Sequence, residues 1–365
     1  MRESLPASPL QKVPLDSFLR LRTNVDFCLT KKGRLMQVYM TRFLQSMERA
    51  RFLRDEKNNW RDIKLRNEAV AVSFEDPESE KMMKRFERMM DCGAYLKFAV
   101  SSTGEKRLAH ANFCRDRMCP GCQKRRSLVV FHQVKNICQA IHANFPTYKY
   151  VLLTLTVPNV KAEKLGDEIK HLHQSWDRMS RRAFFQKSIK GWFRALEVTY
   201  NEERDDYHPH LHILLCVPSG YFKKNYINRD QWLEYWQEAT RYPHITQVDV
   251  RAIRPNKKRP ESDAITSAAA EVGKYATKPS NYVCKAPNGQ YFAVQSVVRE
   301  LAEGITRKRL IAFGGLMKEY KEKLNQQDAE SDSVDLIHTG EDTPAIEAVM
   351  LQVYRWNVGL RNYIN

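Results

Sequence analysis

The chain has 365 residues, with 60 lysines and arginines against 43 aspartates and glutamates, so its formal net charge is +17 at pH 7. Apolar residues make up 42% and aromatic residues 10% of the sequence, which is enough for a packed core and excludes a disordered polymer. No run of about 18 apolar residues is present, and the N-terminal residues lack an apolar signal segment, so we expect neither a membrane span nor secretion. The positive charge indicates an anionic partner, most simply a nucleic acid.

The N-terminal third is predicted to be helical at first and then to form a hairpin. Apolar residues recur at helical spacing over 35–54, and a second helix is predicted over 80–90. Strand-like patterns on either side of Thr103-Gly104 predict a hairpin over 94–113. An Arg- and Lys-rich helix is predicted over 123–144.

The middle of the chain favours a sheet. The β-branched apolar run at 150–157 predicts a strand buried on both faces, and 165–182 is an amphipathic helix. Strands are predicted over 192–200 and 208–217, and the polar stretch 201–206 would join them as a hairpin.

Further helices and an acidic segment complete the pattern. A Trp-rich helix is predicted over 230–240, an edge strand over 245–253, and a helix over 263–278 that Pro279 ends. Residues 326–345 contain acidic residues but no lysine or arginine, which predicts a flexible linker. Aromatic residues return in 349–364, so this last stretch is expected to dock on the body of the protein.

Three cysteines fall within nine residues, at Cys114, Cys119 and Cys122. In a chain without a secretion signal this spacing indicates a structural zinc site, because thiolates are preferred zinc ligands. A tetrahedral site needs a fourth ligand, for which Cys92 is the first candidate and His110 the second. Free, partly buried thiols are the alternative.

Two clusters of basic residues are candidates for contact with phosphates. For the residues around the cysteines, the alternative is a solvated basic surface. One surrounds the cysteines and the other is the loop 255–260; their members are Arg115, Arg117, Lys124, Arg125, Arg126, Lys257, Lys258 and Arg259.

Three histidines alternate along one predicted strand, at His208, His210 and His212. Residues two apart on a strand share a face, so the imidazoles would line one side of it. Three imidazoles on one strand face suit a divalent metal better than a core. Glu197, on the preceding strand, interrupts an apolar run and would add a carboxylate if the two strands pair; otherwise it is an exposed glutamate.

The helix over 263–278 carries a candidate nucleophile. Glu271, Tyr275 and Lys278 share one face by their spacing. Attack by a tyrosine on a phosphate needs a metal and nearby cations, which Lys274 and Lys278 supply. Glu271 could take the tyrosine proton or activate water. By spacing alone, a packing role for Tyr275 is the more common one.

Taken together, these segments resemble the HUH endonuclease superfamily, and more closely the replication initiator (Rep) proteins of small rolling-circle plasmids from Gram-positive bacteria. The resemblance extends over about 92–320 and departs from the family pattern only at Leu152, where Phe is frequent. The family's motifs correspond to 152–159, 208–212 and 271–278, with further matches at 114–127, 195–201 and 309–319.

The resemblance implies an α+β HUH endonuclease fold, with a central antiparallel sheet flanked by helices, a zinc knuckle and a helical N-terminal segment. It also implies that Tyr275 attacks one strand of the plasmid origin, giving a 5′-phosphotyrosyl link and a 3′-OH primer. Mg²⁺ or Mn²⁺ would be held by His210 and His212 with Glu197 or His208. Glu271 would activate water for the terminating cleavage, and the tyrosine helix would lie over the histidine strand.

The expected partners are origin DNA, as a hairpin and as a single strand, a host helicase and polymerase, and a second copy of the chain, all in the bacterial cytoplasm. A transposase or mobilisation relaxase of the HUH type is one alternative, and a non-catalytic zinc-dependent DNA-binding regulator is another. The expected regions are a helical, candidate origin-binding region at 1–90, a zinc-binding region with its basic helix at 91–145, a nicking domain at 146–325, an acidic linker at 326–345 and a C-terminal segment at 346–365.

Overall fold

The structure is a computed structural model that describes residues 52–55, 58–253, 264–273, 279–340 and 348–365. Phe52–Asn365 forms one compact unit. The helix expected over 35–54 lies outside the described residues up to residue 51, and residues 52–54 are not helical, with Phe52 forming a β-bridge to Ile364. The whole of the basic loop 255–260 also lies outside the described residues. The architecture is α+β, as expected.

The larger sheet has five antiparallel strands, in the order β6-β3-β5-β4-β9. The predicted strands at 150–157, 192–200 and 208–217 are confirmed, and the last two form the expected hairpin. β5 is the central strand and pairs with β3 and β4. The strands are β3 Lys149–Thr156, β4 Gly191–Asn201, β5 Asp206–Val217, β6 Val248–Ala252 and β9 Ile311–Gly315.

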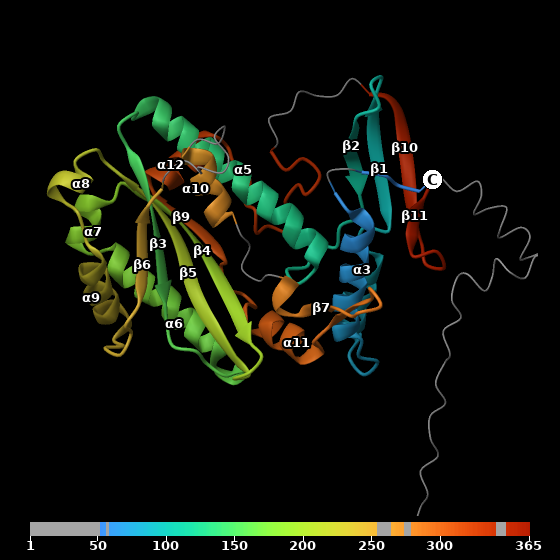
Figure 1. The fold of residues 1–365 in the computed structure, drawn as a ribbon, viewed down its shortest axis with the longest axis horizontal. Coiled ribbons are helices and arrows are strands. Elements are labelled where there is room, and N and C mark those ends of the chain that lie inside the picture. Colours follow the sequence, from blue (N-terminus) through green and yellow to red (C-terminus); the bar gives the residue numbers. More distant parts are fainter. Residues whose placement is uncertain (1–51, 56–57, 254–263, 274–278, 341–347) are drawn as a thin grey trace, which may run out of the picture. The chain divides into compact units, whose positions relative to one another are not determined.

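Helices cover both faces of this sheet (Figure 1). On one face α6 lies against β5 and α9 packs on α6, while on the other α10 lies against β3 and β5 and packs on the long helix α5. Buried Trp176 and Trp232 fill the first of these layers. The helices are α5 Pro120–Asn144, α6 Ala162–Ser180, α7 Ala183–Ser188, α8 Tyr221–Lys224, α9 Arg229–Thr240, α10 Ala264–Val272, α11 Gln295–Gly304 and α12 Leu316–Lys323.

A second sheet joins the two ends of the compact unit, in the order β11-β10-β1-β2. The predicted hairpin over 94–113 is confirmed as β1 and β2, and the C-terminal strand β10 pairs with β1, so that Tyr95 lies opposite Arg355. Trp60 packs against Phe98 under this sheet. The elements are α3 Trp60–Ala71, η2 Val72–Phe74, α4 Glu80–Asp91, β1 Tyr95–Ser101, β2 Lys106–Ala111, β10 Ala348–Asn357 and β11 Asn362–Ile364, with a small hairpin of β7 Val283–Lys285 and β8 Tyr291–Ala293 after η3 Pro279–Asn281.

The prediction of a flexible linker over 326–345 is wrong for residues 326–340, which bind to helix α5. Arg125 of α5 donates hydrogen bonds to the carbonyls of Leu336 (2.7 Å) and Ile337 (2.6 Å), and Arg126 donates to that of Ala329 (2.6 Å). These contacts pair the backbone of the segment with buried guanidinium groups, while Ala329 and Leu336 are themselves buried. Acidic composition gave no sign of this, because the groups that bind are main-chain carbonyls.

None of the helices within the described ranges is long and apolar enough to cross a membrane.

Candidate metal centres

The first candidate centre lies on the paired strands β4 and β5. Their register sets Glu197 directly opposite His210. The Glu197 Oε2 atom lies 2.9 Å from His212 Nε2 and 3.6 Å from His210 Nε2. One ligand atom from each of these residues lies within 4.8 Å of the others, so the three could hold a metal ion. We call them the Glu–His–His cluster.

Contacts behind the rings orient both imidazoles. His210 Nδ1 lies 3.2 Å from the carbonyl oxygen of His208, and His212 Nδ1 lies 3.3 Å from the Thr154 hydroxyl. Thr154 is the β3 residue paired with His212. Because the Nδ1 atoms face these partners, each Nε2 is directed toward Glu197, as in metal sites where outer contacts set the histidine tautomer.

His208 stands beside this cluster rather than in it. Its ring centroid lies 5.2 Å from that of His210, and it is absent from the group of donor atoms that lie within 4.8 Å. Burial lowers the pKa of His208, so its imidazole is favoured in the neutral form.

The donor set fits a divalent metal. Two imidazoles and a carboxylate are ligands that several divalent ions accept, and three protein donors leave coordination positions for substrate oxygens. Glu197 and His210 are buried, while His212 is partly exposed and gives access from solvent. The choice among Mg²⁺, Mn²⁺ and other ions does not follow from this geometry.

Helix α10 lies on the same face of the sheet as the histidines. Cys216 shares the strand face of His212, and Tyr150, its partner on β3, donates a hydrogen bond to the carbonyl of Cys138 on α5 (3.1 Å). α10 packs on α5 and contacts β5, so it covers the histidine face. The predicted placement of this helix is therefore confirmed for its described residues.

The end of α10 approaches α5 closely. Gly273 still donates to the carbonyl of Ala269 (2.8 Å), and a Cβ at Gly273 would lie 3.2 Å from that of Phe131. Glu271 accepts a hydrogen bond from Arg251 of β6 (3.1 Å). Three further expected site residues, Lys274, Tyr275 and Lys278, lie outside the described residues, so the shared face of Glu271, Tyr275 and Lys278 stays a prediction.

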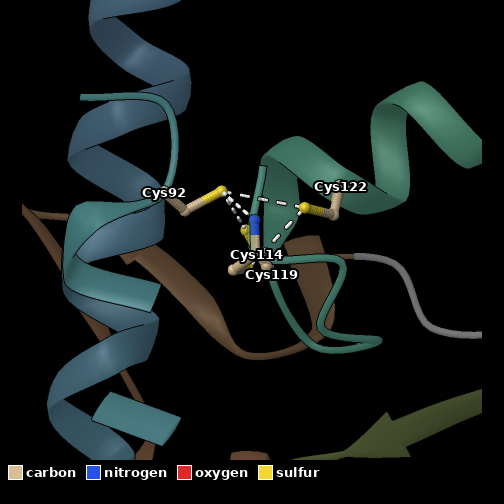
Figure 2. Close-up of side chains that lie close together, drawn as sticks. All are labelled: Cys92, Cys114, Cys119 and Cys122. Carbon is tan, nitrogen blue, oxygen red and sulfur yellow. Dashed lines mark hydrogen bonds between the residues drawn. The ribbon is translucent and has the colours of Figure 1, made fainter. Parts of the chain in front are cut away.

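The second candidate centre is formed by four cysteines (Figure 2). Cys92 caps the end of α4, Cys114 follows β2, and Cys119 and Cys122 belong to the first turn of α5, where Pro120 occupies the first helical position. The sulfur of Cys92 lies 3.7 Å from that of Cys122 and 3.6 Å from that of Cys119, and Cys114 and Cys122 are 3.7 Å apart. We call the four residues the cysteine cluster.

These distances fit a tetrahedral zinc ion. A Zn–S bond of about 2.3 Å places the corners of the tetrahedron about 3.8 Å apart. The backbone N–H groups of Cys114 and Arg115 donate to the sulfurs of Cys92 (3.3 Å) and Cys122 (3.2 Å). Hydrogen bonds from Cys114 and its neighbours hold the pKa of Cys92 well below its ordinary value, whereas burial raises that of Cys119.

The structure brings Cys92, and not His110, to the other three cysteines. His110 lies exposed on β2 with its ring 5.7 Å from that of Tyr95. Cys92 is separated from Cys114 by the β1–β2 hairpin, whose closure returns the chain to the end of α4. Only the closure of the β1–β2 hairpin in space distinguishes Cys92 from His110 as the fourth ligand.

The basic residues near the cysteines do not form one surface. Arg115 and Lys124 are exposed, but Arg117 donates to the carbonyl of Lys308 (2.7 Å). The expectation that Arg125 and Arg126 contact DNA is wrong, because both are buried and bind the carbonyls of residues 326–340. Lys257, Lys258 and Arg259 lie outside the described part of the chain.

Sequence reasoning missed two polar residues that organise these centres. Thr154 orients His212, and its only signal was a hydroxyl within an apolar strand. Asp116 is a buried carboxylate that accepts from both Arg85 Nε (2.7 Å) and its terminal nitrogen (2.9 Å). No local pattern marked that pair, because its partners lie on separate elements.

Together, the antiparallel sheet, the Glu–His–His cluster and the cysteine cluster define an α+β protein with two candidate metal sites. A family model described as "Replication protein" matches residues 105–364. "Protein rep" of Streptococcus pneumoniae is 33% identical over 313 residues, which cover 85% of this chain and 92% of that protein. The chain therefore belongs to this family of replication proteins, which confirms the resemblance drawn from its motifs.

Two further relatives agree with this assignment. "Protein rep" of Bacillus amyloliquefaciens is 33% identical over 325 residues, covering 85% of this chain and 94% of that protein. A "Replication protein" of Staphylococcus aureus is 38% identical over 221 residues, covering 60% of this chain and 91% of that protein. No solved structure gives a significant match.

Proposed function

We propose that this protein initiates rolling-circle replication of a plasmid by nicking one strand of its double-strand origin. The observation that carries the proposal is the Glu–His–His cluster on β4 and β5, together with α10, which contacts β5 and ends at Val272, shortly before Tyr275 in the sequence. Membership of a replication-protein family supports this interpretation of the cluster.

In the proposed reaction the Tyr275 oxygen attacks the scissile phosphorus, and the bond from phosphorus to the 3′ oxygen breaks. The phenol proton is lost and the 3′ oxygen gains one, so the step is a transesterification that leaves a 5′-phosphotyrosyl link and a 3′-OH. A divalent ion, when bound by Glu197, His210 and His212, polarises the phosphate. Lys274 and Lys278 offset the negative charge that develops there.

Glu271 is proposed to activate water in the terminating cleavage. Glu271 is on the last described turn of α10, and it would lie one helical turn before Tyr275 if the helix continued. Arg251 holds its carboxylate by a hydrogen bond of 3.1 Å. The free 3′-OH would pass to a host polymerase, with a host helicase opening the strand, in the bacterial cytoplasm.

The cysteine cluster is proposed to hold structural Zn²⁺. All four sulfurs come from protein residues and leave no position for a substrate, as in structural zinc sites. Zinc here would tie the end of α4, the residues after β2 and the start of α5 into one unit.

The decisive experiment is replacement of Tyr275 by Phe, with Tyr226→Phe as a control because Tyr226 is an exposed tyrosine on another part of the surface. Nicking of supercoiled origin DNA and the covalent adduct should be lost in Tyr275→Phe while DNA binding is kept. Nicking at the wild-type rate would refute the assignment. Specific binding by the wild type without any adduct would point instead to a non-catalytic regulator.

Replacing Glu271 by Ala tests the terminating step. The first nick should remain and multiple-turnover release should fail, because the water lacks its base. Glu303→Ala, an exposed glutamate on α11, should behave as wild type. Release at an unchanged rate in Glu271→Ala would remove this residue from the mechanism.

A further inference from the structure

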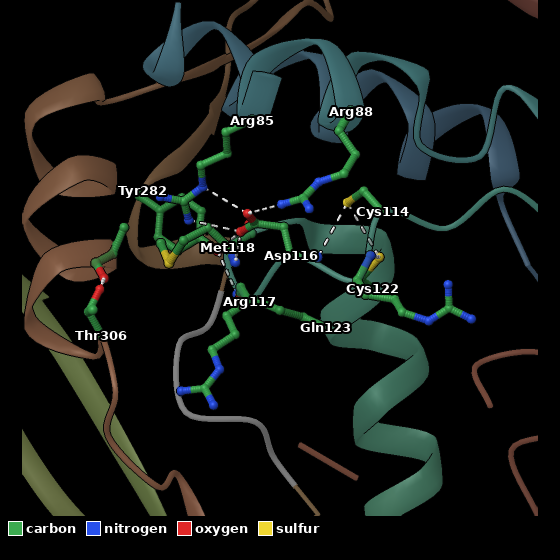
Figure 3. A network of polar contacts seen from close by, with 12 residues as sticks. Arg85, Arg88, Cys114, Asp116, Arg117, Met118, Cys122, Gln123, Tyr282 and Thr306 are labelled. Atoms are coloured by element: carbon green, nitrogen blue, oxygen red, sulfur yellow. Dashed lines mark hydrogen bonds and ion pairs between the residues drawn. The ribbon is translucent and has the colours of Figure 1, made fainter. Parts of the chain in front are cut away.

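A large cleft lies beside the cysteine cluster and does not include the Glu–His–His cluster. Its volume is about 1110 Å³, and it is lined by α4, by residues 112–117, by the residues around the end of α11 and by Asp332. Figure 3 shows Arg85 and Arg88 reaching from α4 toward Asp116, with Arg117 and Thr306 nearby. Three elements far apart in the sequence therefore share this cleft.

The α4 side of the cleft is a basic helix face. Lys81, Lys84, Arg85 and Arg88 are spaced three and four residues apart, so they lie along one side of the helix. Met89, on another side, is fully buried and anchors the helix. Over the whole cleft, seven lining side chains are basic and four are acidic.

Two exposed arginines add to this charge from the other segments. Arg115 and Arg307 both have left-handed backbones, with φ of 59° and 56°. Such a conformation is unfavourable for arginine and persists where surrounding contacts impose it. The Arg115 N–H is bound to Cys122 and its carbonyl to Arg126, which fixes the backbone and leaves the side chain exposed.

Part of the positive charge in the cleft is not neutralised. Asp116 binds Arg85 and lies 3.7 Å from Arg88, and Glu80 pairs with Lys84. Among the residues that the structure describes, the side chains of Lys81, Arg115 and Arg307 make no ion pair. Asp116 thus fixes α4 to residues 112–117. The side chains of Lys81, Arg115 and Arg307 face solvent.

We propose that this cleft, which we call the basic cleft, binds the phosphate backbone of DNA without reading its sequence. The inference rests on the proposed function, which makes DNA the substrate. Pockets for small molecules are mostly apolar and about 300–1,000 Å³ in volume, whereas this larger cleft has a predominantly charged lining. Exposed cations spread over three segments suit a polyanion, whose backbone contacts fix position rather than sequence.

Helix α11 links the basic cleft to the proposed nicking site. Its Glu300 carboxylate accepts a hydrogen bond from Tyr207, the residue before His208, while Ile305 and Arg307 beyond its end line the cleft. DNA held in the cleft would therefore be positioned by an element that is also attached to the histidine strand.

The test is a triple variant of the full chain, Lys81→Ala with Arg115→Ala and Arg307→Ala. Binding to labelled duplex and single-stranded DNA of unrelated sequence is measured by fluorescence anisotropy over a range of salt concentrations. The slope of log Kd against log salt should fall by about 2.7 for duplex DNA, since each phosphate contact contributes about 0.9. For single strands the loss of the same three contacts should lower the slope by about 2.1, since each contributes about 0.7 there.

The matched control removes the same charge elsewhere, by Lys164→Ala with Lys170→Ala and Lys187→Ala. These exposed lysines lie on α6 and α7, outside the cleft. The control should keep the wild-type slope. Equal weakening in both triple variants, or no change in the first, would overturn the basic cleft as a DNA site.

A charge-preserving variant, Lys81→Arg with Arg115→Lys and Arg307→Lys, should retain the wild-type slope, which separates lost charge from lost folding. Nicking of an origin oligonucleotide is measured in parallel. A wild type that binds through the cleft but never nicks would refute the proposed function and keep the cleft. If the wild type nicks and the triple variant binds DNA as tightly as the wild type, the proposed function is kept and the basic cleft is refuted as a DNA site.

Discussion

The two candidate metal centres are built from different kinds of structure. The cysteine cluster collects its sulfurs from a helix end, a loop and a helix start, and Cys92, Cys119 and Cys122 are fully buried. The Glu–His–His cluster lies on adjacent strands of a sheet, with partly exposed His212. The first is closed by protein donors, while the second keeps a side from which a substrate can complete the coordination.

This difference predicts how far each centre depends on its ion. The β4–β5 ladder extends from Gly191 to Asn201 and positions Glu197 and both histidines by backbone hydrogen bonds. The segments of the cysteine cluster are joined by N–H to sulfur bonds and by side-chain contacts such as that of Arg85 with Asp116, rather than by a continuous strand ladder. Ion removal should therefore unfold the surroundings of the cysteines and leave the sheet intact.

The largest effect is expected from Cys119→Ser. Loss of one thiolate from a four-sulfur site should remove zinc and lower the free energy of unfolding by more than about 4 kcal/mol. Zinc content by metal analysis and urea unfolding measure both. Cys284→Ser, at an exposed cysteine, is the control and should change neither. Full zinc content with an unchanged unfolding midpoint would contradict a structural site.

A smaller effect is expected from Glu197→Gln, which keeps the shape and removes the charge. Affinity for Mn²⁺ should fall by about 100-fold or more, with a matching loss of nicking at low Mn²⁺, while urea unfolding stays within about 1 kcal/mol of wild type. Calorimetric titration measures the affinity. Glu202→Gln, exposed in the β4–β5 turn, is the control. Unchanged affinity would exclude Glu197 as a ligand.

The smallest effect is expected from Thr154→Val, which removes the hydroxyl beside His212 Nδ1 and keeps the side-chain volume. About a tenfold loss of Mn²⁺ affinity is expected, because the imidazole remains but its orientation is less restrained. The concentration of Mn²⁺ that gives half-maximal nicking reports it. A loss as large as that of Glu197→Gln would show that Thr154 does more than orient the ring.

Local patterns in the sequence were sufficient for the strands that carry the Glu–His–His cluster. The alternation of His208, His210 and His212 set their shared face, and the hairpin placed Glu197 opposite them. The choice between Cys92 and His110 could not be made in this way, because both lie within reach of the knuckle along the chain. It depends on where the β1–β2 hairpin closes in space.

Interactions between distant segments account for the features that the sequence did not predict. Arg125 and Arg126 belong to a basic run that looks solvated, yet α5 turns them inward to bind carbonyls more than 200 residues away. Composition describes side chains, so it could not reveal that the backbone of 326–340 is their partner. The last stretch was expected to dock, but its pairing with β1 follows only from the structure.

The pairing of β10 with β1 also sets an order of assembly during synthesis. The five-stranded sheet is complete once β9 has been made, whereas the sheet beside the cysteine cluster must wait for residues 348–364. On the ribosome the proposed nicking sheet can thus form first, because domains fold as their residues emerge. A nascent or prematurely terminated chain would carry that sheet while β1 still exposed an unpaired edge, a known starting point for aggregation.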